Sequence, residues 1–287
     1  MLAKKAFAKT NLFLDVIRKR GDGYHDVLTV FQQLALADDV QLNKTETPGE
    51  LYLSCSDPEL DCGDKNLVSK AVKLIRENTG NDTGLRIDIR KRIPLAGGLA
   101  GGSADAGATL TGLNELLGLR LSQDQLVKLA VKLGADVAFC VIGGTCVGEG
   151  IGEKLARIKS PSSKPVVVVD PQLKMPEKKT LWAYQNLPLS SLPHPSVEPM
   201  KNALRQNDWT SVCASFYNCF EEVTPKHYPV VNEIKDALLA AGATGALMNG
   251  SGPTVFGVFD SPRAAERGQS ALSESFSTAR VVLTATL

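Results

Sequence analysis

The sequence has no long apolar run, no basic stretch and few histidines. None of its apolar runs approaches the ~20 residues needed to span a bilayer, and its N-terminus lacks the apolar core of a secretory signal. Lysine and arginine total 32 against 31 acidic residues, so the charge balance gives no support to a nucleic-acid or membrane partner. We therefore expect a cytoplasmic protein that binds neither.

Clustered metal and disulfide ligands are also missing. The six cysteines form no C-x-x-C pair, and the three histidines (His25, His194 and His227) are far apart in the sequence. Widely spaced cysteines in a chain of 287 residues are typical of free thiols in a reducing compartment. Because a zinc site needs cysteine and histidine ligands in close groups, we expect neither a structural metal nor disulfides.

What the sequence does contain is a globular mixture of helix and strand patterns, with 43% apolar residues. Apolar residues at helical spacing in NLVSKAVKLIRENTG predict a helix that Gly80 ends. Ser122 and Gln125 predict a capping box at the start of another helix. Strict alternation in GLRIDIRKRI predicts a half-buried strand, and the apolar run of residues 137–150 is also predicted as strand.

The order of these elements predicts an α+β protein with a mostly antiparallel sheet. The chain is long enough for two modest domains. Its composition changes at SPSSKP, just before the apolar run VVVVD. We therefore predict an N-terminal domain of residues 1–158 and a C-terminal domain of residues 159–287.

The stretch PLAGGLAGGSADAG, which begins at Pro94, follows a predicted strand and leads into a predicted helix near Ser103. Glycines let successive backbone N–H groups converge on one point, and the start of a helix adds partial positive charge toward an anion. The same pattern also serves plain close packing. The motifs of a P-loop and of a Rossmann fingerprint are absent, so the stretch is either a phosphate cradle of another kind or a packing seam.

Two charged residues allow a functional and a structural interpretation each. Asp136, in LGADVAF, is either a turn cap after a helix or a base held at the edge of a cleft. Lys9, in FAKTNLFL, is either an edge-strand or snorkelling lysine or a buried cation beside an anion. The residues alone leave both choices open.

Taken together, four blocks of sequence resemble the GHMP kinases. They are AKTNLFLDVIRKRGDGYHDVLTVFQQL, IPLAGGLAGGSADAGATLTGLNELLGL, LGADVAFCVIGGTCVGEGIGE and GATGALMNGSGPTVFGVF. They span most of the chain in the order expected for the family. The resemblance implies an N-terminal ATP-binding domain with a mixed or antiparallel sheet and helices. It also implies a C-terminal ferredoxin-like α/β sandwich domain that contributes to the acceptor site.

The resemblance implies an ATP-dependent small-molecule kinase that uses Mg²⁺. Asp136 matches the catalytic base, and Lys9 the lysine that holds this carboxylate ionised and favours the developing alkoxide. Because DGYH is specific to kinases with a cytosine-bearing acceptor, the implied substrate is cytidine diphospho-methylerythritol, a precursor in non-mevalonate isoprenoid synthesis. The implied substrate-binding residues are Asn11, Tyr24, His25 and Tyr184. The implied ATP-binding residues are Pro94, Leu95, Ala96, Gly97, Gly98, Leu99, Ala100, Gly101, Gly102, Ser103 and Ala104.

The match has three departures from the usual family pattern. Ala100 stands where the family has glycine, Ala104 where a second serine is common, and Asn249 where the NGSGPT motif often has serine. Ser103 keeps a hydroxyl for phosphate or Mg²⁺, and NGSGPT is expected to pack near the phosphate loop. Two alternatives stay open: a GHMP kinase for another small alcohol, and a nucleotide-binding regulator without kinase activity. We expect a monomer or a weak homodimer.

Overall fold

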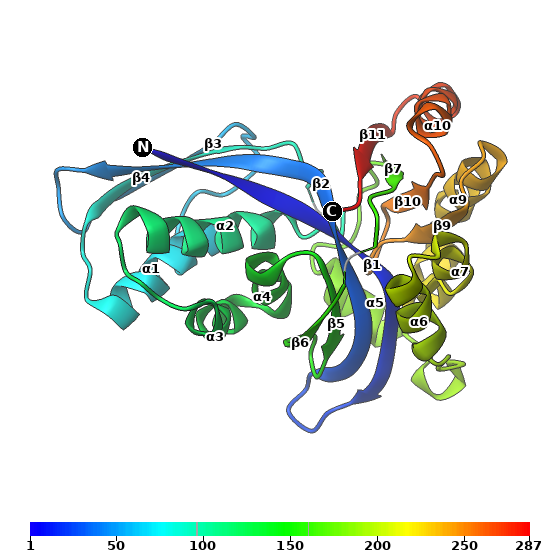
Figure 1. The fold of residues 1–287 in the computed structure, drawn as a ribbon, viewed down its shortest axis with the longest axis horizontal. Coiled ribbons are helices and arrows are strands. Elements are labelled where there is room, and N and C mark those ends of the chain that lie inside the picture. Colours follow the sequence, from blue (N-terminus) through cyan, green and yellow to red (C-terminus); the bar gives the residue numbers. More distant parts are fainter. Residues whose placement is uncertain (96, 160) are drawn as a thin grey trace. The chain divides into compact units, whose positions relative to one another are not determined.

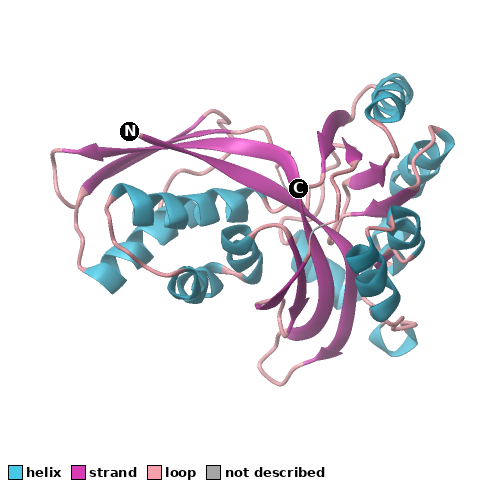
Figure 2. Ribbon diagram, viewed as in Figure 1, coloured by secondary structure: helices cyan, strands magenta, loops and turns pink. Residues whose placement is uncertain are grey.

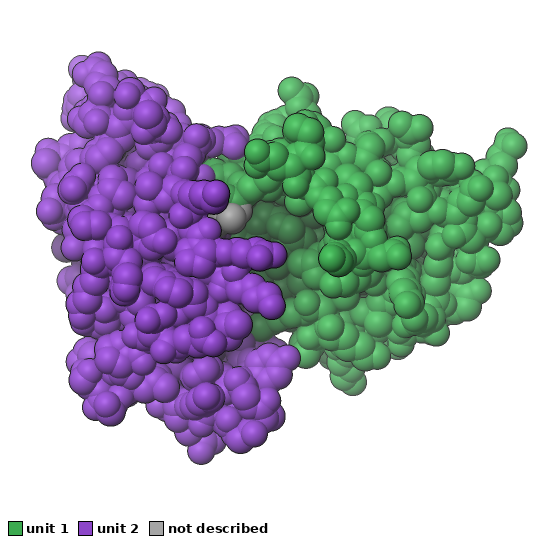
Figure 3. Space-filling model, turned by 180° about the vertical axis from the view of Figure 1, so that it is seen from behind, with its two compact units in different colours: residues 1–8, 36–95, 100–143 green, residues 9–35, 96–99, 144–287 purple. Residues whose placement is uncertain are grey.

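The computed structural model describes residues 1–95, 97–159 and 161–287. The chain divides into two compact units, coloured separately in Figure 3. Unit 1 contains residues 1–8, 36–95 and 100–143, and unit 2 contains residues 9–35, 96–99 and 144–287. Two long strands, β1 (Leu2–Lys19) and β2 (His25–Thr45), have residues in both units.

In unit 1, part of β2 pairs with β4 (Gly84–Arg90) in antiparallel fashion, and β3 (Leu51–Cys55) lies parallel to β4. Four helices accompany these strands (Figure 1): α1 (Leu67–Thr79), α2 (Gly101–Leu116), α3 (Gln123–Leu133) and α4 (Ala135–Ile142). Helix α2 packs close to β2, because a Cβ at Gly112 would lie 2.5 Å from Leu42 Cδ1.

Local sequence signals set the helix ends of unit 1. The side chain of Asn66 accepts the Val68 N–H at the start of α1, and Gly80 ends that helix with φ +68°. The predicted capping box of Ser122 and Gln125 opens α3. Both predicted helices are therefore confirmed.

One predicted strand is wrong over its first part. Residues 135–142 form the helix α4, and the strand β5 (Thr145–Glu149) begins only after Gly143 and Gly144, which both have positive φ. A continuous apolar run has no periodicity that separates a buried strand from a buried helix. Asp136 in the first turn favours the helix, since a carboxylate stabilises the positive end of the helix dipole.

Unit 2 contains two groups of strands (Figure 2). In the first, β1 lies parallel to β8 (Tyr217–Asn218), while β2 pairs with β5, which pairs with β6 (Lys154–Ile158), both antiparallel. The second is a four-stranded sheet in the order β11 (Arg280–Ala285), β7 (Pro165–Asp170), β10 (Val255–Val258) and β9 (Gly245–Met248). All its neighbouring strands are antiparallel.

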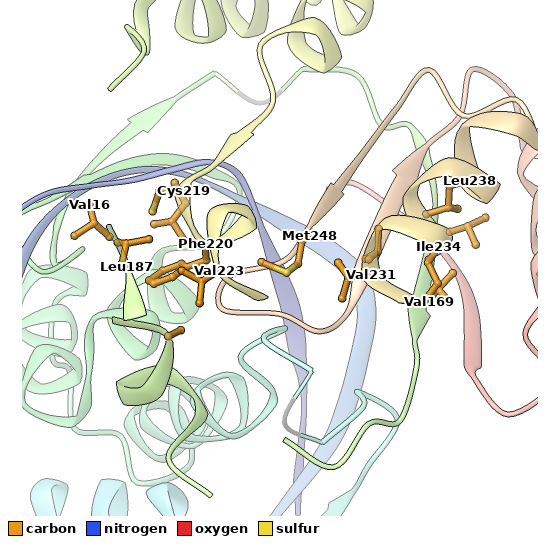
Figure 4. Packing of buried hydrophobic residues seen from close by; sticks show 14 of the residues in the cluster. Val16, Val169, Leu187, Cys219, Phe220, Val223, Val231, Ile234, Leu238 and Met248 are labelled. Atoms are coloured by element: carbon orange, nitrogen blue, oxygen red, sulfur yellow. The ribbon is translucent and has the colours of Figure 1, made fainter. Parts of the chain in front are cut away.

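The second sheet has the ferredoxin-like arrangement. Helix α9 (Val230–Ala240) precedes β9 and packs against β9 and β10, and α10 (Pro262–Ser275) connects β10 to β11 and packs against β11 and β7. The chain order β-α-β-β-α-β with spatial order 4-1-3-2 follows. Val169, Ile234 and Leu238 pack between sheet and helix in the hydrophobic cluster of Figure 4.

The remaining helices of unit 2 lie between β7 and α9 in the chain. They are α5 (Lys179–Asn186), η1 (Leu189–Ser191), α6 (Glu198–Gln206), α7 (Trp209–Ala214), η2 (Cys219–Glu222) and α8 (Thr224–His227). Strands and helices are thus mixed in both units, which confirms the predicted α+β class. In the described part of the chain, every helix is too short or too polar to cross a membrane.

Candidate active site

The glycine-rich stretch connects the end of β4 to α2 and passes from one unit to the other and back. Pro94 and Leu95 belong to unit 1, Gly97–Leu99 to unit 2, and the residues from Ala100 onward to unit 1 again. Ala96, which we also assigned to ATP binding, lies outside the described residues. Gly98 has φ +81° and Ala100 has φ +59°, so the stretch turns twice through left-handed conformations.

Helix α2 begins directly after this turn. Its first intrahelical bond runs from the Ala104 N–H to the Ala100 carbonyl at 2.8 Å, and no side chain caps the start. Gly101, Gly102 and Ser103 form the first turn; Gly102 is exposed, and Gly101 and Ser103 are half-buried. The N–H groups of a first helical turn have no acceptor inside the helix, so this turn has the features of an anion-binding site.

A buried ionic cluster supports this turn from inside unit 1. Lys91 Nζ lies 2.5 Å from Asp38 Oδ2 and 2.7 Å from Asp105 Oδ2, and all three side chains are at most 4% exposed. A Cβ at Gly101 would lie 3.2 Å from Lys91 Nζ. Burial opposes the charged lysine, but the two carboxylates together raise its pKa above the ordinary value. Burial raises the pKa of Asp105 to about 7.

Lys9 lies in unit 2 and is a buried cation, with 4% of its surface exposed. Its Nζ donates to Asn11 Oδ1 at 2.7 Å and lies 5.4 Å from the centroid of the Phe31 ring. Asn11 is held in turn, because its Nδ2 donates to Thr29 Oγ1 at 2.8 Å. The structure thus excludes the alternative of an exposed edge-strand lysine.

The NGSGPT turn lies against the part of the glycine stretch that belongs to unit 2, as the sequence predicted. A Cβ at Gly98 would lie only 2.7 Å from the Asn249 carbonyl oxygen. Asn249 Oδ1 accepts hydrogen bonds from Thr10 Oγ1 at 2.9 Å and from the Asn11 N–H at 3.1 Å. Its Nδ2 is buried and finds no acceptor in the described part of the chain. Asn249 therefore joins three segments of unit 2 around the glycine stretch.

Lys179 is a second lysine at this turn, and the sequence analysis missed it. It is the first residue of α5, and its Nζ donates to the Gly252 carbonyl at 2.5 Å. Burial, and then the nearby charge of Lys9, lower the pKa of Lys179 to about 8 against the opposing effect of Asp170. No short motif in the sequence connects residues 179 and 252, so no local signal could have found this contact.

Two of the predicted acceptor residues, His25 and Tyr184, meet near the C-terminal end of α5, whereas Asn11 lies beside Lys9. The rings of His25 and Tyr184 stack with centroids 4.5 Å apart and planes inclined by 24°. Phe220 contacts Tyr184 edge-on at 4.9 Å. Tyr24, the neighbour of His25, is 61% exposed. Burial, with a contribution from the charge of Lys19, lowers the pKa of His25 below its ordinary value.

Asp136 lies in unit 1, as the second residue of α4, and is half-buried. The predicted site residues are therefore divided between the units. Unit 1 carries Asp136, Pro94, Leu95 and residues 100–104, and unit 2 carries residues 97–99, Lys9, Asn11, Tyr24, His25 and Tyr184. Among the described residues, no group of three histidine, cysteine, aspartate or glutamate side chains is placed to hold a metal ion.

Comparison with known families identifies the class to which this fold and site belong. The model of the GHMP kinases N terminal domain matches residues 66–144, and that of the GHMP kinases C terminal domain matches residues 195–278. The chain has the two-domain architecture of the GHMP kinases, which are ATP-dependent small-molecule phosphotransferases.

Individual relatives narrow the class. The chain is 42% identical to 4-diphosphocytidyl-2-C-methyl-D-erythritol kinase of Acetivibrio thermocellus, over 92% of each chain. It is 44% identical to the kinase of the same name from Geobacillus thermodenitrificans, over 90% of this chain and 88% of the relative. The crystal structure of a 4-(cytidine 5'-diphospho)-2C-methyl-D-erythritol kinase matches with TM-score 0.83 and 32% identity, over 99% of both chains. The chain therefore belongs to the 4-diphosphocytidyl-2-C-methyl-D-erythritol kinase family.

A more distant structure shares the fold alone. The homoserine kinase of Cytophaga hutchinsonii matches with TM-score 0.77 at 22% identity, over 99% of this chain and 94% of that one. Kinases of this architecture thus accept different alcohols. The arrangement of helices and strands therefore does not by itself determine which alcohol is phosphorylated.

Proposed function

We propose that this protein transfers the γ-phosphoryl group of ATP to the 2-hydroxyl of 4-diphosphocytidyl-2-C-methyl-D-erythritol. The products are the 2-phosphate and ADP, in the non-mevalonate route to isoprenoid precursors. The observation that carries the proposal is the buried Lys9–Asn11 pair beside the NGSGPT turn and Gly98, in a chain 42% identical to a kinase of that name. Phosphoryl transfer needs mainly positioning and charge neutralisation, and this arrangement offers both.

ATP is held in this proposal by the glycine stretch. The triphosphate lies against residues 94–104, where glycines leave room and the first turn of α2 presents its N–H groups. Mg²⁺ bound with the phosphates would neutralise the negative charge that develops on them. A half-buried hydroxyl in that first turn fits such an ion, since Mg²⁺ prefers oxygen ligands and binds largely through substrate phosphates. Ser103 would supply it.

Proton transfer and charge stabilisation fall to two residues. Asp136 accepts the proton of the acceptor hydroxyl, a task that suits a half-buried carboxylate. Lys9 favours the ionised base and the developing alkoxide, because a buried cation acts strongly on nearby negative charge. Asn11 holds the Lys9 ammonium in place at 2.7 Å.

The acceptor base is bound by aromatic side chains in this proposal. Cytosine stacks between Tyr24 and Tyr184, and His25 hydrogen-bonds its edge. Because His25 now stacks on Tyr184, the imidazole must turn from the ring face toward the edge of the base. The exposed Tyr24 is free of close packing that would hinder its closing over the base.

Three further predictions complete the proposal. We propose a boundary near residue 158 between an N-terminal ATP-binding domain and a C-terminal domain that contributes to the acceptor site. We also propose that the protein works in the cytoplasm. It acts as a monomer or weak homodimer.

The test is turnover with Mg·ATP and 4-diphosphocytidyl-2-C-methyl-D-erythritol, followed as ADP release. Turnover of mevalonate, homoserine or a sugar in its place would identify a kinase for another alcohol, and ATP binding without turnover of any of them would identify a regulator. Asp136→Asn is expected to lower kcat by about 10²–10⁴-fold while leaving ATP binding nearly intact. Asp124→Asn, in the first turn of α3, is the matched control. An active Asp136→Asn enzyme would exclude Asp136 as the base.

A further inference from the structure

Two lysines converge on the NGSGPT turn within unit 2. Lys9 Nζ donates to Asn11 Oδ1, and a Cβ at Gly250 would lie 3.9 Å from that same oxygen. Lys179 Nζ donates to the Gly252 carbonyl at 2.5 Å. A single short turn therefore lies beside both ammonium groups, which come from β1 and from the start of α5.

The electrostatics of this pair favour a bound anion. Like charges in a partly desolvated place repel each other, and Lys9 indeed lowers the pKa of Lys179. Asp170 is the carboxylate that opposes this shift, but burial and Lys9 outweigh it, and burial also raises the pKa of Asp170 itself. An anion that bound near Lys179 would remove the repulsion and gain a charge-assisted hydrogen bond.

Helix α5 relates Lys179 to the proposed base site. Lys179 is its first residue and Tyr184 its sixth, so the two positions are about 7.5 Å apart along the helix axis and about 140° apart around it. Tyr184 stacks on His25, where we have proposed that cytosine binds. A nucleoside diphosphate carries its phosphates one ribose away from the base. Helix α5 carries an aromatic ring and a cation with a comparable separation along its axis, and the lysine side chain extends to the Gly252 carbonyl of the NGSGPT turn.

We propose that Lys179 binds the diphosphate of the acceptor and thereby makes this kinase select a cytidine diphosphate rather than a cytidine. The inference rests on the proposed function, because it uses the cytosine site at Tyr184. Lys9 remains beside the reacting hydroxyl, and Lys179 is a recognition residue for the non-reacting phosphates. The γ-phosphate of ATP offers the same phosphate chemistry, and the experiment separates the two sources.

The experiment compares the affinities of CDP, cytidine and ATP by calorimetry for the wild type, Lys179→Met and Lys179→Arg. Losing one charge-assisted contact is expected to weaken CDP binding by about 10–100-fold, with cytidine and ATP binding unchanged. Lys179→Arg is expected to restore much of the preference for CDP over cytidine. Lys178→Met, which alters the exposed neighbouring lysine, is the matched control and should leave all three affinities as they are.

Each result supports or overturns the inference. Equal CDP affinity in the wild type and Lys179→Met overturns the inference about Lys179. It leaves the proposed function intact, because both proteins then still bind CDP. A loss of ATP binding instead of CDP binding also overturns it and assigns Lys179 to the γ-phosphate. If the wild type binds neither CDP nor cytidine, the cytosine site fails and the proposed function fails with it. Unchanged cytidine binding in Lys179→Met shows that the variant is folded.

Discussion

Lys91 in unit 1 and Lys179 in unit 2 both lie beside glycine-rich turns and are largely shielded from solvent. The charges of their neighbours, however, are opposite in sign. Lys91 contacts two buried carboxylates, Asp38 and Asp105, and its pKa is raised. Lys179 is influenced by another lysine and bonds a neutral carbonyl, and its pKa is lowered. The neighbours of Lys91 thus favour its charged form, whereas burial and the charge of Lys9 favour the neutral form of Lys179.

The difference separates a structural role from a binding role. A compensated buried cluster fixes the backbone around it, and removing one member leaves an uncompensated charge. An excess of buried positive charge costs stability unless a ligand offsets it, which is why such groups concentrate at functional sites. We therefore expect changes in the Lys91 cluster to alter stability, and changes at the two lysines of unit 2 to alter binding and turnover.

The largest effect is expected for Asp38→Ala in the Lys91 cluster. Asp38 accepts hydrogen bonds from Lys91 Nζ and from the N–H groups of Arg92 and Ile93. Its removal should lower the free energy of unfolding by about 3–5 kcal/mol, as for other broken buried pairs. Urea denaturation followed by circular dichroism measures the change.

The adjacent Asp39 is the matched control for this prediction. It pairs with Lys5 and Arg92 in partly exposed positions, so Asp39→Ala should lower the free energy of unfolding by only about 0–1 kcal/mol. Equal effects of the two substitutions would show that the Lys91 cluster contributes no more than a surface ion pair.

The next effect concerns Lys9, on the other side of the comparison. Lys9→Met is expected to lower kcat by about 10²–10³-fold, because it removes a preorganised cation from the proposed transition state. It should also raise the pKa of Lys179, since the charge of Lys9 lowers that pKa. Steady-state kinetics and NMR titration of labelled lysine side chains measure the two changes.

Lys5→Met is the control for Lys9→Met, because Lys5 lies on the same strand and its side chain is 53% exposed. It should change neither turnover nor the pKa of Lys179. If Lys9→Met leaves that pKa where it was, the two ammonium groups do not interact and the contrast with Lys91 is lost.

A pH-dependent effect follows from the raised pKa of Asp105. The folded protein retains the Asp105 proton up to a pKa of about 7, whereas the unfolded chain releases it near 3.8. Asp105 therefore makes stability fall as pH rises from about 4 to 7, by at most ~1.4 kcal/mol per pH unit. Asp105→Asn removes this contribution, so its stability relative to the wild type should increase with pH across that window. A constant difference between pH 4 and pH 7 would contradict the assignment.

These contrasts also show how far the sequence alone could lead. Two helix ends were predictable because Gly80 and Ser122 act on backbone groups within a few residues. The helix over 135–142 was not, since its apolar run fits either a buried helix or a buried strand. The glycine stretch and NGSGPT could be paired through the family resemblance, and their contact at Gly98 is confirmed.

The two lysine environments were beyond sequence reasoning for a physical reason. Lys91 meets Asp38 across 53 residues of chain, and Lys179 meets Gly252 across 73. Such contacts depend on tertiary packing, which no local propensity encodes. Lysines that look alike in the sequence thus acquire opposite pKa shifts only when the chain is folded.

The smallest effect concerns Ala100, next to the glycine that covers Lys91. Ala100 has φ +59° and ψ +32°, a left-handed conformation that costs an alanine roughly 1–2 kcal/mol. Glycine adopts it freely but loses more entropy on folding, so Ala100→Gly should raise the free energy of unfolding by about 0.5–1 kcal/mol. Ala104→Gly, inside the same helix and buried, should lower it by at least about 0.5–1 kcal/mol. Urea denaturation measures both changes in the free energy of unfolding. Changes of opposite sign would locate the strain at Ala100 itself, whereas changes of the same sign would show that Ala100 is not strained.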